Sequence, residues 1–322
     1  MLPANRAVVH TLRGDRPPLP ALASLALAAA LLAGGCGSAR RELPQLPLPP
    51  SPTTVEIAPR VGLALGGGGA RGFAEVGVLR VLAEERIPVS VIAGTSVGAV
   101  IGALYADQPD VFALEYEALA IQERDLLDRS LLSLISGGGY AKGERIESYL
   151  GSRLAHAAIE DLPLRFAAVA TDLMSGQTIA FERGPVARAV RASGAIPGIF
   201  APVEIDGRLY VDGGVSNPVP ADIARRLGAE VVIAVAIPRE VPKDPPRTQV
   251  GVAMQSIAIM AAEIGRCRER EADVVLTPEV GDVAFDDFSQ KRRLIEAGIA
   301  ATRAALPEIR RAIAAKTKRV LQ

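Results

Sequence analysis

A serine flanked by two glycines is the first feature of this chain that could do chemistry. Gly94-Thr95-Ser96-Val97-Gly98 follows an apolar run, Val89 to Ala93, that predicts a buried strand, and it opens an apolar helix predicted over Ser96 to Ala106. Small flanking residues permit a sharp strand-to-helix turn that lifts a serine hydroxyl clear of a sheet. The pentapeptide therefore indicates a nucleophilic Ser96, and the alternative is a serine that only caps the helix.

A glycine-rich loop precedes this element. Gly66 to Gly72 (GGGGARG) separates a strand predicted over Val61 to Leu65 from a helix predicted over Phe73 to Glu85. Glycines let the backbone turn tightly and aim several amide N–H groups at one point, which suits an anion. A dinucleotide site would need an acidic residue at the end of the second strand, and a phosphate-binding P-loop would need Gly-Lys-Ser/Thr. Neither is present, so an oxyanion hole is the favoured interpretation.

A serine nucleophile needs a base, and the histidines do not supply an obvious one. His10 lies near the amino terminus, and His156 stands in a stretch without a turn motif, where we expect a surface residue. A Ser-His-Asp triad is therefore poorly supported, which turns attention to the carboxylates. Asp212-Gly213-Gly214 follows a hairpin-like segment, Ile205 to Val211, that places an aspartate at a strand end. The alternative is that Asp212 only stabilises a turn.

Composition excludes several other kinds of chemistry. The 322 residues carry 36 basic and 36 acidic side chains, and aromatic residues make up 4% with no tryptophan, which argues against nucleic acid as a partner. Cys36 and Cys267 cannot build a disulfide framework or a multi-cysteine zinc site. Asp286-Asp287 is expected to be a solvated turn and not a cation site. We therefore predict no metal and no cofactor.

The first 36 residues have the pattern of a signal peptide. Arginines precede an apolar run, Leu19 to Ala33, which is too short for a transmembrane helix. Leu31 to Cys36 (LLAGGC) resembles a bacterial lipoprotein box, which would make Cys36 a lipidated residue; ordinary secretory cleavage and a misassigned start codon are the alternatives. Gly37 after this cysteine favours the outer membrane of a two-membrane bacterium. The expected location is the cell envelope, on its periplasmic side.

The remaining chain divides into a spacer and one folded domain. Residues 37–60 are rich in proline and show no helical or strand period, so they are expected to form a semi-extended tether. Residues 61–322 alternate short apolar runs with amphipathic stretches, which predicts a single α/β domain with a mainly parallel central sheet and helices on both faces. Further strands are expected over 166–171, 231–236 and 273–277, and a helix over 290–306.

Two apolar stretches could serve the substrate. Leu126 to Tyr140 ends in Gly137-Gly138-Gly139-Tyr140 and could be a lid or an acyl groove, although ordinary helix core explains the same residues. Val252 to Ile264 (VAMQSIAIMAAEI) is expected to be a packed helix rather than a lipid surface.

Four sequence blocks together resemble the patatin-like phospholipase family, in particular its small bacterial members. The blocks are Gly66 to Gly72, Gly94 to Gly98, Ala192-Ser193-Gly194-Ala195-Ile196-Pro197 with Ala201-Pro202, and Asp212-Gly213-Gly214 with Asn217-Pro218-Val219-Pro220. They cover roughly residues 61–237 and occur in the family's order. The resemblance implies a three-layer domain similar to that of α/β-hydrolases.

The resemblance also implies a mechanism and a site. Ser96 would attack an ester carbonyl, and Asp212 would accept its proton, which forms a Ser-Asp dyad. The oxyanion would meet the amides of Gly67, Gly68 and Gly69, with Arg71 steadying the loop or meeting a phosphate. Supporting glycines are Gly94, Gly98, Gly213 and Gly214. The expected partner is a lipid or acyl ester, at a membrane reached through Cys36. An acyltransferase or thioesterase with the same dyad, and a lipid-binding envelope protein without catalysis, are the alternatives.

Overall fold

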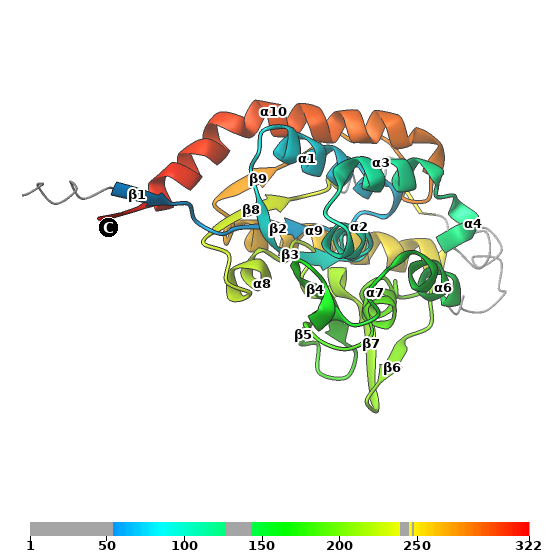
Figure 1. Ribbon diagram of the computed structural model, residues 1–322. Helices are drawn as coiled ribbons and strands as arrows, with labels where there is room; N and C mark the ends of the chain where they lie inside the picture. The colour runs from blue at the N-terminus through cyan, green and yellow to red at the C-terminus, as the bar shows by residue number, and fades with distance from the viewer. Residues whose placement is uncertain (1–53, 127–142, 239–244, 247, 322) are drawn as a thin grey trace, which may run out of the picture. The chain divides into compact units, whose positions relative to one another are not determined.

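The computed structural model describes residues 54–126, 143–238, 245–246 and 248–321 (Figure 1). The strands are β1 (Thr54–Ile57), β2 (Val61–Leu65), β3 (Val89–Thr95), β4 (Arg165–Asp172), β5 (Thr178–Phe181), β6 (Val203–Ile205), β7 (Arg208–Asp212), β8 (Val231–Val235), β9 (Val274–Leu276) and β10 (Lys318–Leu321). The α-helices are α1 (Phe73–Glu84), α2 (Val97–Asp107), α3 (Val111–Ala120), α4 (Glu123–Leu126), α6 (Glu144–Arg153), α7 (Val186–Ser193), α8 (Ala221–Arg226), α9 (Gln249–Glu269) and α10 (Lys291–Lys316). Short 3-10 turns occur at η1 (Gly69–Gly72), η2 (Ile159–Asp161), η3 (Gly213–Val215) and η4 (Phe288–Gln290).

The central sheet is mainly parallel, as the alternation of strand and helix patterns predicts. Its strands follow the order β6-β7-β4-β3-β2-β8-β9, and β5 pairs with β4. The pairs β2–β3, β2–β8, β3–β4 and β8–β9 are parallel, whereas β5 and β7 run antiparallel to β4 and β6 antiparallel to β7. The β6–β7 pair coincides with the segment that the sequence indicates as a hairpin, whereas β5 was not predicted.

Side-chain size divides the two faces of the sheet. The larger residues Leu63, Ile92 and Phe166 point into a core shared with α1, α2, α7 and α10. Their neighbours along the same strands are smaller, for example Ala93 and Ala167, and belong to a second core that α8 covers. Because successive residues of a strand face opposite sides, both layers are built from the same short runs. The three-layer α/β prediction is confirmed.

The carboxyl ends of the parallel strands meet at one edge of the sheet, here called the carboxyl edge. The glycine loop follows β2 and the serine turn follows β3 at this edge, whereas the strands begin at the opposite, amino edge. Open α/β sheets bind ligands at their carboxyl edge.

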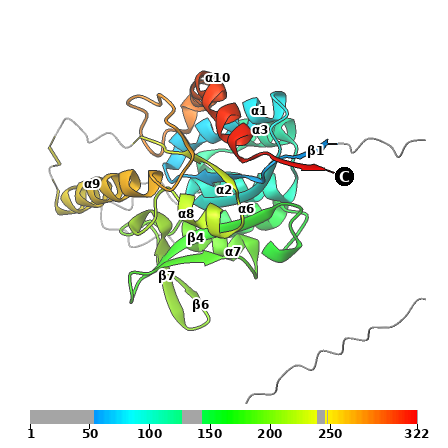
Figure 2. The same cartoon turned by 90° about the vertical axis from the view of Figure 1, so that its left-hand side faces the viewer.

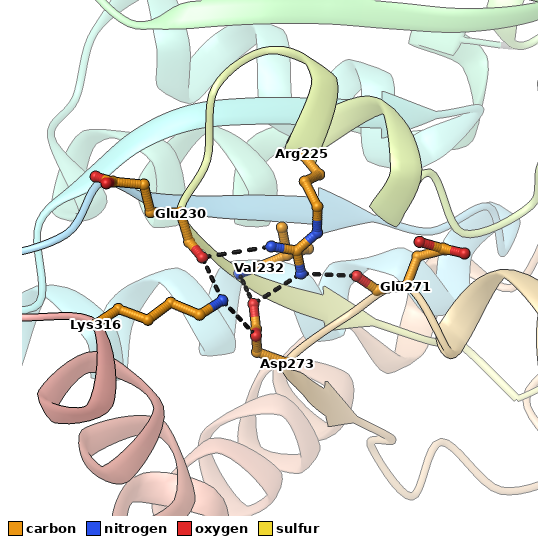
Figure 3. A network of polar contacts seen from close by, with 6 residues as sticks. All are labelled: Arg225, Glu230, Val232, Glu271, Asp273 and Lys316. Carbon is orange, nitrogen blue, oxygen red and sulfur yellow. Dashed lines mark hydrogen bonds and ion pairs between the residues drawn. The ribbon is translucent and has the colours of Figure 1, made fainter.

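A charged network occupies the amino edge (Figure 3). The Asp273 carboxylate accepts hydrogen bonds from Lys316 at 2.6 Å, from Arg225 at 2.8 Å and from the Val232 amide at 2.8 Å. Lys316 and Arg225 also donate to the carbonyl oxygen of Glu230. Burial alone would raise the pKa of Asp273, but these donors outweigh it and hold that pKa below its ordinary value. The network joins α8, β8, β9 and α10.

The structure differs from the sequence-based expectation at both ends of the described domain. Residues 54–57 form β1, which pairs antiparallel with β10, although they fall within the expected spacer. The last helix continues past Pro307 to Lys316 instead of ending near residue 306. Pro307 is exposed, so water can hydrate the carbonyl that loses its helical partner, and close packing of α10 on α1 holds the helix together.

A third difference concerns α9. The expected packing of this helix is wrong for its first half, because Val252, Ile259 and Met260 are 51%, 44% and 56% exposed. Figure 2 shows the gold helix α9 projecting outward from the rest of the ribbon. Among the described residues, no helix combines the length and the hydropathy needed to cross a bilayer. The expected lid or groove lies mostly at residues 127–142, outside the described residues.

Candidate active site

Ser96 occupies a strained turn between β3 and α2. Its backbone angles are φ 56° and ψ −122°, a conformation that non-glycine residues rarely adopt. Ser96 is buried, with 7% of its surface exposed, and it precedes the first turn of α2, whose Ala99 amide donates to the Ser96 carbonyl oxygen at 2.9 Å. This is the geometry that the glycine-flanked pentapeptide predicts.

Both flanking glycines are required by close backbone contacts. A Cβ on Gly94 would lie 2.3 Å from the carbonyl oxygen of Gly98, and a Cβ on Gly98 would lie 2.4 Å from that of Leu65. Neither distance is possible for a side chain, so no larger residue fits at either position. The two glycines therefore permit α2 to start directly against the end of β2.

A second serine, Ser193, fixes the backbone of the turn. Its fully buried hydroxyl accepts the Ser96 N–H at 2.9 Å and donates to the Val169 carbonyl at 2.5 Å. Ser193 ends α7, far from Ser96 in the sequence. Ser193 belongs to one of the four sequence blocks, but its residue type alone does not indicate a role. That role is visible only once the fold places Ser193 beside the turn.

The glycine loop carries two candidate oxyanion donors rather than three. The Gly67 amide donates to the Pro218 carbonyl at 3.0 Å, and the Gly66 amide to the Val235 carbonyl at 3.1 Å. The expected use of Gly67 as a donor therefore conflicts with a hydrogen bond that the fold already makes. Gly68 and Gly69 remain, since their amides donate to no group in the described part of the chain.

Arg71 braces this loop from within. Its Nε donates to the Gly68 carbonyl at 3.2 Å, and its Nη1 donates to the Pro238 carbonyl at 3.1 Å. Gly69 has a positive φ of 59°, and a Cβ there would lie 2.4 Å from the Phe285 carbonyl oxygen. The loop conformation thus depends on contacts from β8 onward, and the side chain that was expected to steady it does so.

Asp212 ends β7 and is buried, with 5% of its surface exposed. Its carboxylate accepts the Gly214 amide at 2.7 Å, and its own amide donates to the Ala195 carbonyl at 2.9 Å. A Cβ on Gly213 would lie 2.2 Å from the Val169 carbonyl oxygen, so a glycine is required directly after the aspartate.

The strand register brings Ser96 and Asp212 to adjoining strand ends. Thr95 pairs with Val169 of β4, and Asp212 pairs with the next β4 residue, Ala170. A Cβ on Gly213 would lie 3.1 Å from Thr95 Cγ2, so the two strand ends are in contact. Residues separated by more than a hundred positions therefore meet at the middle of β4. A hydrogen bond between the two side chains stays a prediction.

The segment after Asp212 joins the two halves of the site. The Thr95 hydroxyl donates to the Asn217 carbonyl at 2.9 Å, and the Asn217 amide donates to the Gly213 carbonyl at 2.7 Å. The next residue, Pro218, accepts the Gly67 amide. The Asn217-Pro218 pair therefore links the serine turn, the aspartate turn and the glycine loop by backbone hydrogen bonds, a role that sequence analysis did not assign.

A buried acid lies under the glycine loop. Glu75, in the first turn of α1, has no exposed surface, and neither carboxyl oxygen has a hydrogen-bond partner among the described residues. Burial raises the pKa of Glu75 well above its ordinary value. The backbone of Gly66 opposes this shift in part, although its N–H donates to Val235 and does not form a hydrogen bond of normal geometry with the carboxyl.

An apolar pocket opens beside Ser96. The empty space between its walls is about 830 Å³, with the open mouth included. Its apolar side chains come from α1, α2, α3, α4, α6, α7 and the segments around them: Phe73, Val97, Val100, Ile101, Leu104, Ala118, Ile121, Leu126, Ile146, Val190, Ile196, Phe200, Phe285 and Phe288. Leu126 is the one described residue of the expected acyl groove, and it does line this pocket.

Besides Ser96, the polar side chains that line the pocket are Tyr149 and Asp286. Tyr149 lines the wall, but its hydroxyl donates to Glu117 at 2.6 Å, and burial together with this hydrogen bond raises the pKa of Tyr149. His156 pairs with Asp107 at 2.8 Å on α2's far end and does not line the pocket. In the described ranges, no three His, Cys, Asp or Glu side chains are grouped to hold a metal ion.

A serine turn and a glycine loop at the carboxyl edge, above a mainly parallel sheet, place the chain in the class of α/β proteins with a serine elbow. More specifically, it belongs to the patatin-like phospholipase family, whose sequence profile matches residues 63–225. This match contains the glycine loop, Ser96, Ser193 and Asp212.

Individual relatives share this region. An NTE family protein of Mycobacterium tuberculosis is 42% identical over 193 residues, which are 58% of this chain and 53% of that protein. The chain therefore spans about half the length of this relative. Patatin-like phospholipase domain-containing protein 7 of Rattus norvegicus is 39% identical over 187 residues, 55% of this chain and 13% of that protein. Among solved structures, VipD from Legionella pneumophila matches 83% of this chain and 69% of its own, with TM-score 0.47 and 14% identity.

Proposed function

We propose that this protein is a lipid acyl hydrolase of the phospholipase A or lysophospholipase type, with Ser96 as nucleophile. The observation that supports this most directly is the opening of an apolar pocket beside the strained Ser96 turn. A nucleophile on the wall of an apolar pocket suits an ester with an apolar acyl chain. Membership of the patatin-like phospholipase family agrees with a lipid substrate.

The reaction proceeds in two halves. The Ser96 hydroxyl oxygen attacks the ester carbonyl carbon while Asp212 accepts the hydroxyl proton, and collapse of the tetrahedral intermediate expels the alcohol, which takes up that proton. Water then attacks the acyl-enzyme, gives its proton to Asp212 and releases the fatty acid, and the proton returns to Ser96. The amides of Gly68 and Gly69 stabilise the oxyanion in each half, and removal of one such donor typically costs about 2.7 to 4 kcal/mol of barrier.

The buried position of Asp212 fits this task. An aspartate in water is a weak base, with a pKa of about 3.9. The close Gly214 N–H and the surrounding protein fix the carboxylate in place, so it need not reorganise when the proton moves. A carboxylate used in this way requires no histidine.

Hydrolysis of a chain-length series of acyl esters and phospholipids, in chelator, tests the proposal. The parent should hydrolyse esters, while Ser96→Ala and Asp212→Asn should each lose at least about a thousandfold of kcat. Ser152→Ala and Asp206→Asn, at exposed positions, are the matched controls and should retain activity. Full activity of Ser96→Ala, or no hydrolysis of any ester by a folded parent, would overturn it. Transfer of the acyl group to an added alcohol in preference to water would favour the acyltransferase alternative.

We further propose that the domain is tethered to the periplasmic side of a bacterial envelope membrane through a lipidated Cys36. This rests on the lipoprotein-like segment Leu31 to Cys36 and the proline-rich stretch after it. Mass spectrometry of the mature protein should find a diacylglyceryl-modified Cys36 as its first residue. An unprocessed Met1 would contradict the tether and leave the hydrolase proposal untouched.

A further inference from the structure

The exposed apolar side chains of this protein are concentrated around the carboxyl edge. Seven large ones lie on segments that leave this edge or cover it, and they are called the apolar face here: Leu173, Met174, Leu209, Val215, Val252, Ile259 and Met260. The other exposed large apolar residues of the described ranges are spread over α3, β9 and the β1–β10 ribbon. Contiguous exposed apolar surface marks an interaction site more reliably than single exposed residues do.

One part of the apolar face is the uncharged N-terminal part of α9, from Gln249 to Ala262. From Gln249 to Ala262 the helix contains no charged residue, and charges begin at Glu263. Val252, Ile259 and Met260 recur at helical spacing, so they share one side of the helix, together with the exposed Ser256. Exposed helical surface in a water-soluble setting normally carries charges, and here it does so only in the second half.

The charged C-terminal part of α9 lies beside the active site, and the uncharged part extends outward from it. A Cβ on Gly265 would lie 3.5 Å from Pro218, the residue that accepts the Gly67 amide of the glycine loop. The helix therefore touches the body of the domain beside the site. From Gly265 back to Gln249 it rises about 24 Å, at 1.5 Å per residue, and Figure 2 shows it projecting away from the other helices.

The other part of the apolar face comes from turns that follow β4 and β7. The Leu173 amide donates to the Leu209 carbonyl at 2.8 Å, which joins the β4–β5 turn to the β6–β7 hairpin. The Ser216 hydroxyl contacts Thr171 at 2.8 Å and thereby fixes η3, with Val215, against the end of β4. Since η3 also contacts α9, the turns and the helix adjoin each other next to Asp212.

We propose that the apolar face rests on the surface of a lipid bilayer, with the uncharged half of α9 lying among the head groups and upper acyl chains. This proposal deepens the proposed function, on which it rests, because it assigns the surface through which a lipid substrate would reach Ser96. The occupant follows from chemistry and place: residues 249–262 of α9 expose apolar side chains with no charged residue between them, and the turns directly follow β4 and Asp212, beside the site that a lipid must enter. Burial of such side chains in the interfacial region is what holds amphipathic elements on membranes.

The absence of charge also predicts how the contact is made. Attraction to anionic head groups weakens with salt, whereas burial of apolar surface does not. We therefore expect contact with vesicles of zwitterionic phosphatidylcholine, and expect it to persist at high salt. A second copy of the chain is the competing occupant, which the experiment distinguishes.

The test places a polarity-sensitive fluorophore at single cysteines of the full chain. Ile259→Cys reports on the apolar face, and Phe112→Cys, on α3 and 70% exposed, is the matched control; both carry Cys36→Ser and Cys267→Ser. Ether-linked phosphatidylcholine vesicles cannot be hydrolysed, so the measurement does not depend on activity. The label at position 259 should shift to the blue on adding vesicles and be quenched by nitroxide-bearing lipid, and the label at 112 should do neither.

Three results would overturn the proposal. They are an unchanged label at position 259, an equal response at both positions, and a blue shift without vesicles that grows with protein concentration, which would mean that a second copy covers the face. A response at 259 without hydrolysis of any ester would leave the docking surface standing and reject the proposed function. Hydrolysis of soluble esters with no response of the label at position 259 would reject the docking surface and leave the proposed function standing.

Kinetics supply a second readout. Ile259→Glu with Met260→Glu should lower hydrolysis of phosphatidylcholine vesicles by about tenfold or more, because full burial of one such side chain is worth at least about a factor of ten in affinity. Hydrolysis of a soluble short-chain ester should not change. Phe112→Glu with Tyr116→Glu should affect neither rate, and an equal loss of vesicle hydrolysis in both double variants would contradict the assignment.

Discussion

The two edges of the central sheet are held together by different kinds of contact. At the carboxyl edge, glycines pack against backbone carbonyls, and neutral hydrogen bonds through Ser193, Asn217 and Pro218 fix the turns. At the amino edge, charged side chains around Asp273 join helices and strands. The carboxyl edge therefore depends mainly on backbone shape, to which Arg71 and the Asp172–Arg208 pair add charged contacts, while the amino edge depends on charge.

The difference teaches how a site can be positioned without many polar side chains. Backbone amides and glycine contacts have few conformations open to them, so they hold Ser96, the glycine loop and Asp212 in a fixed arrangement. At the amino edge no chemistry is proposed, and flexible charged side chains serve stability there. Each edge should accordingly respond to a different kind of perturbation.

The largest effect is expected from adding a single methyl group at the carboxyl edge. Gly98→Ala would force a Cβ to within 2.4 Å of the Leu65 carbonyl oxygen. Relief of such a clash costs about 1 to 3 kcal/mol or more of unfolding free energy, and the accompanying shift of Ser96 should abolish hydrolysis. Chemical denaturation and ester hydrolysis measure both. Gly151→Ala is the control, since a Cβ there meets nothing within 4 Å; a Gly98→Ala variant as stable and active as this control would refute the argument from shape.

Removal of the Ser193 hydroxyl should come next. Ser193→Ala leaves the Ser96 amide and the Val169 carbonyl buried without their partner, which costs about 1 to 3 kcal/mol. Because the amide belongs to the strained turn, kcat should fall while KM for a soluble ester changes little. Ser152→Ala, which removes an exposed hydroxyl at the end of α6, is the comparison. A Ser193→Ala variant with parental kcat would show that the turn holds its shape without this serine.

Glu75 should make stability fall as pH rises. Its pKa is raised in the folded protein, so the folded state keeps a proton that the unfolded state releases. The contribution of Glu75 to the free energy of unfolding is complete below the ordinary glutamate pKa. It is lost as pH rises from there to the pKa of Glu75 in the folded protein, by about 1.4 kcal/mol for each pH unit in between. Glu75→Gln should remove this slope in denaturation series over pH 5 to about 8. Parallel profiles for parent and variant would mean that Glu75 is ionised in the fold.

Asp273 should act in the opposite sense, and more weakly. Its pKa is lowered in the folded protein, so the stability it contributes is present above the ordinary aspartate pKa and is lost as pH falls through the folded pKa. Asp273→Asn should cost about 1 kcal/mol at neutral pH, since the group is partly exposed, and should leave kcat unchanged. The variant should also lose less stability in acid than the parent does. A fall in kcat would contradict the separation of the two edges.

Local sequence patterns indicated Ser96 with Gly94 and Gly98, the glycine loop and Asp212 as candidates, because a turn needs its glycines at fixed spacing. The role expected for Asp212 came from the family resemblance, since its pattern alone fits a turn as well. Ser193 was not given a role, since its function depends on α7 ending beside β3. The Gly67 amide was counted as a free donor, because its partner, Pro218, comes from a distant segment.

The same limit explains the errors in the fold. The apolar period of α9 was interpreted as packing, since periodicity shows that a helix has an apolar side but not what covers it. The C-terminal helix was expected to end at residue 306, but it continues through Pro307, because an exposed proline costs a long packed helix only one hydrogen bond with a solvated carbonyl. The β1–β10 ribbon joins the two ends of the described domain, and nothing in four residues of either strand signals a partner so remote.

Covalent labelling by a serine-reactive phosphonate ester tests the central claim, that the carboxyl edge makes Ser96 a nucleophile, most directly. Peptide mass spectrometry after brief exposure should find the phosphonyl group on Ser96 alone. Labelling should be absent in Ser96→Ala and slowed by orders of magnitude in Asp212→Asn, while Asp273→Asn labels at the parental rate. A folded parent protein whose Ser96 stays unmodified would contradict the account. So would a Ser96→Ala variant that is labelled as fast as the parent.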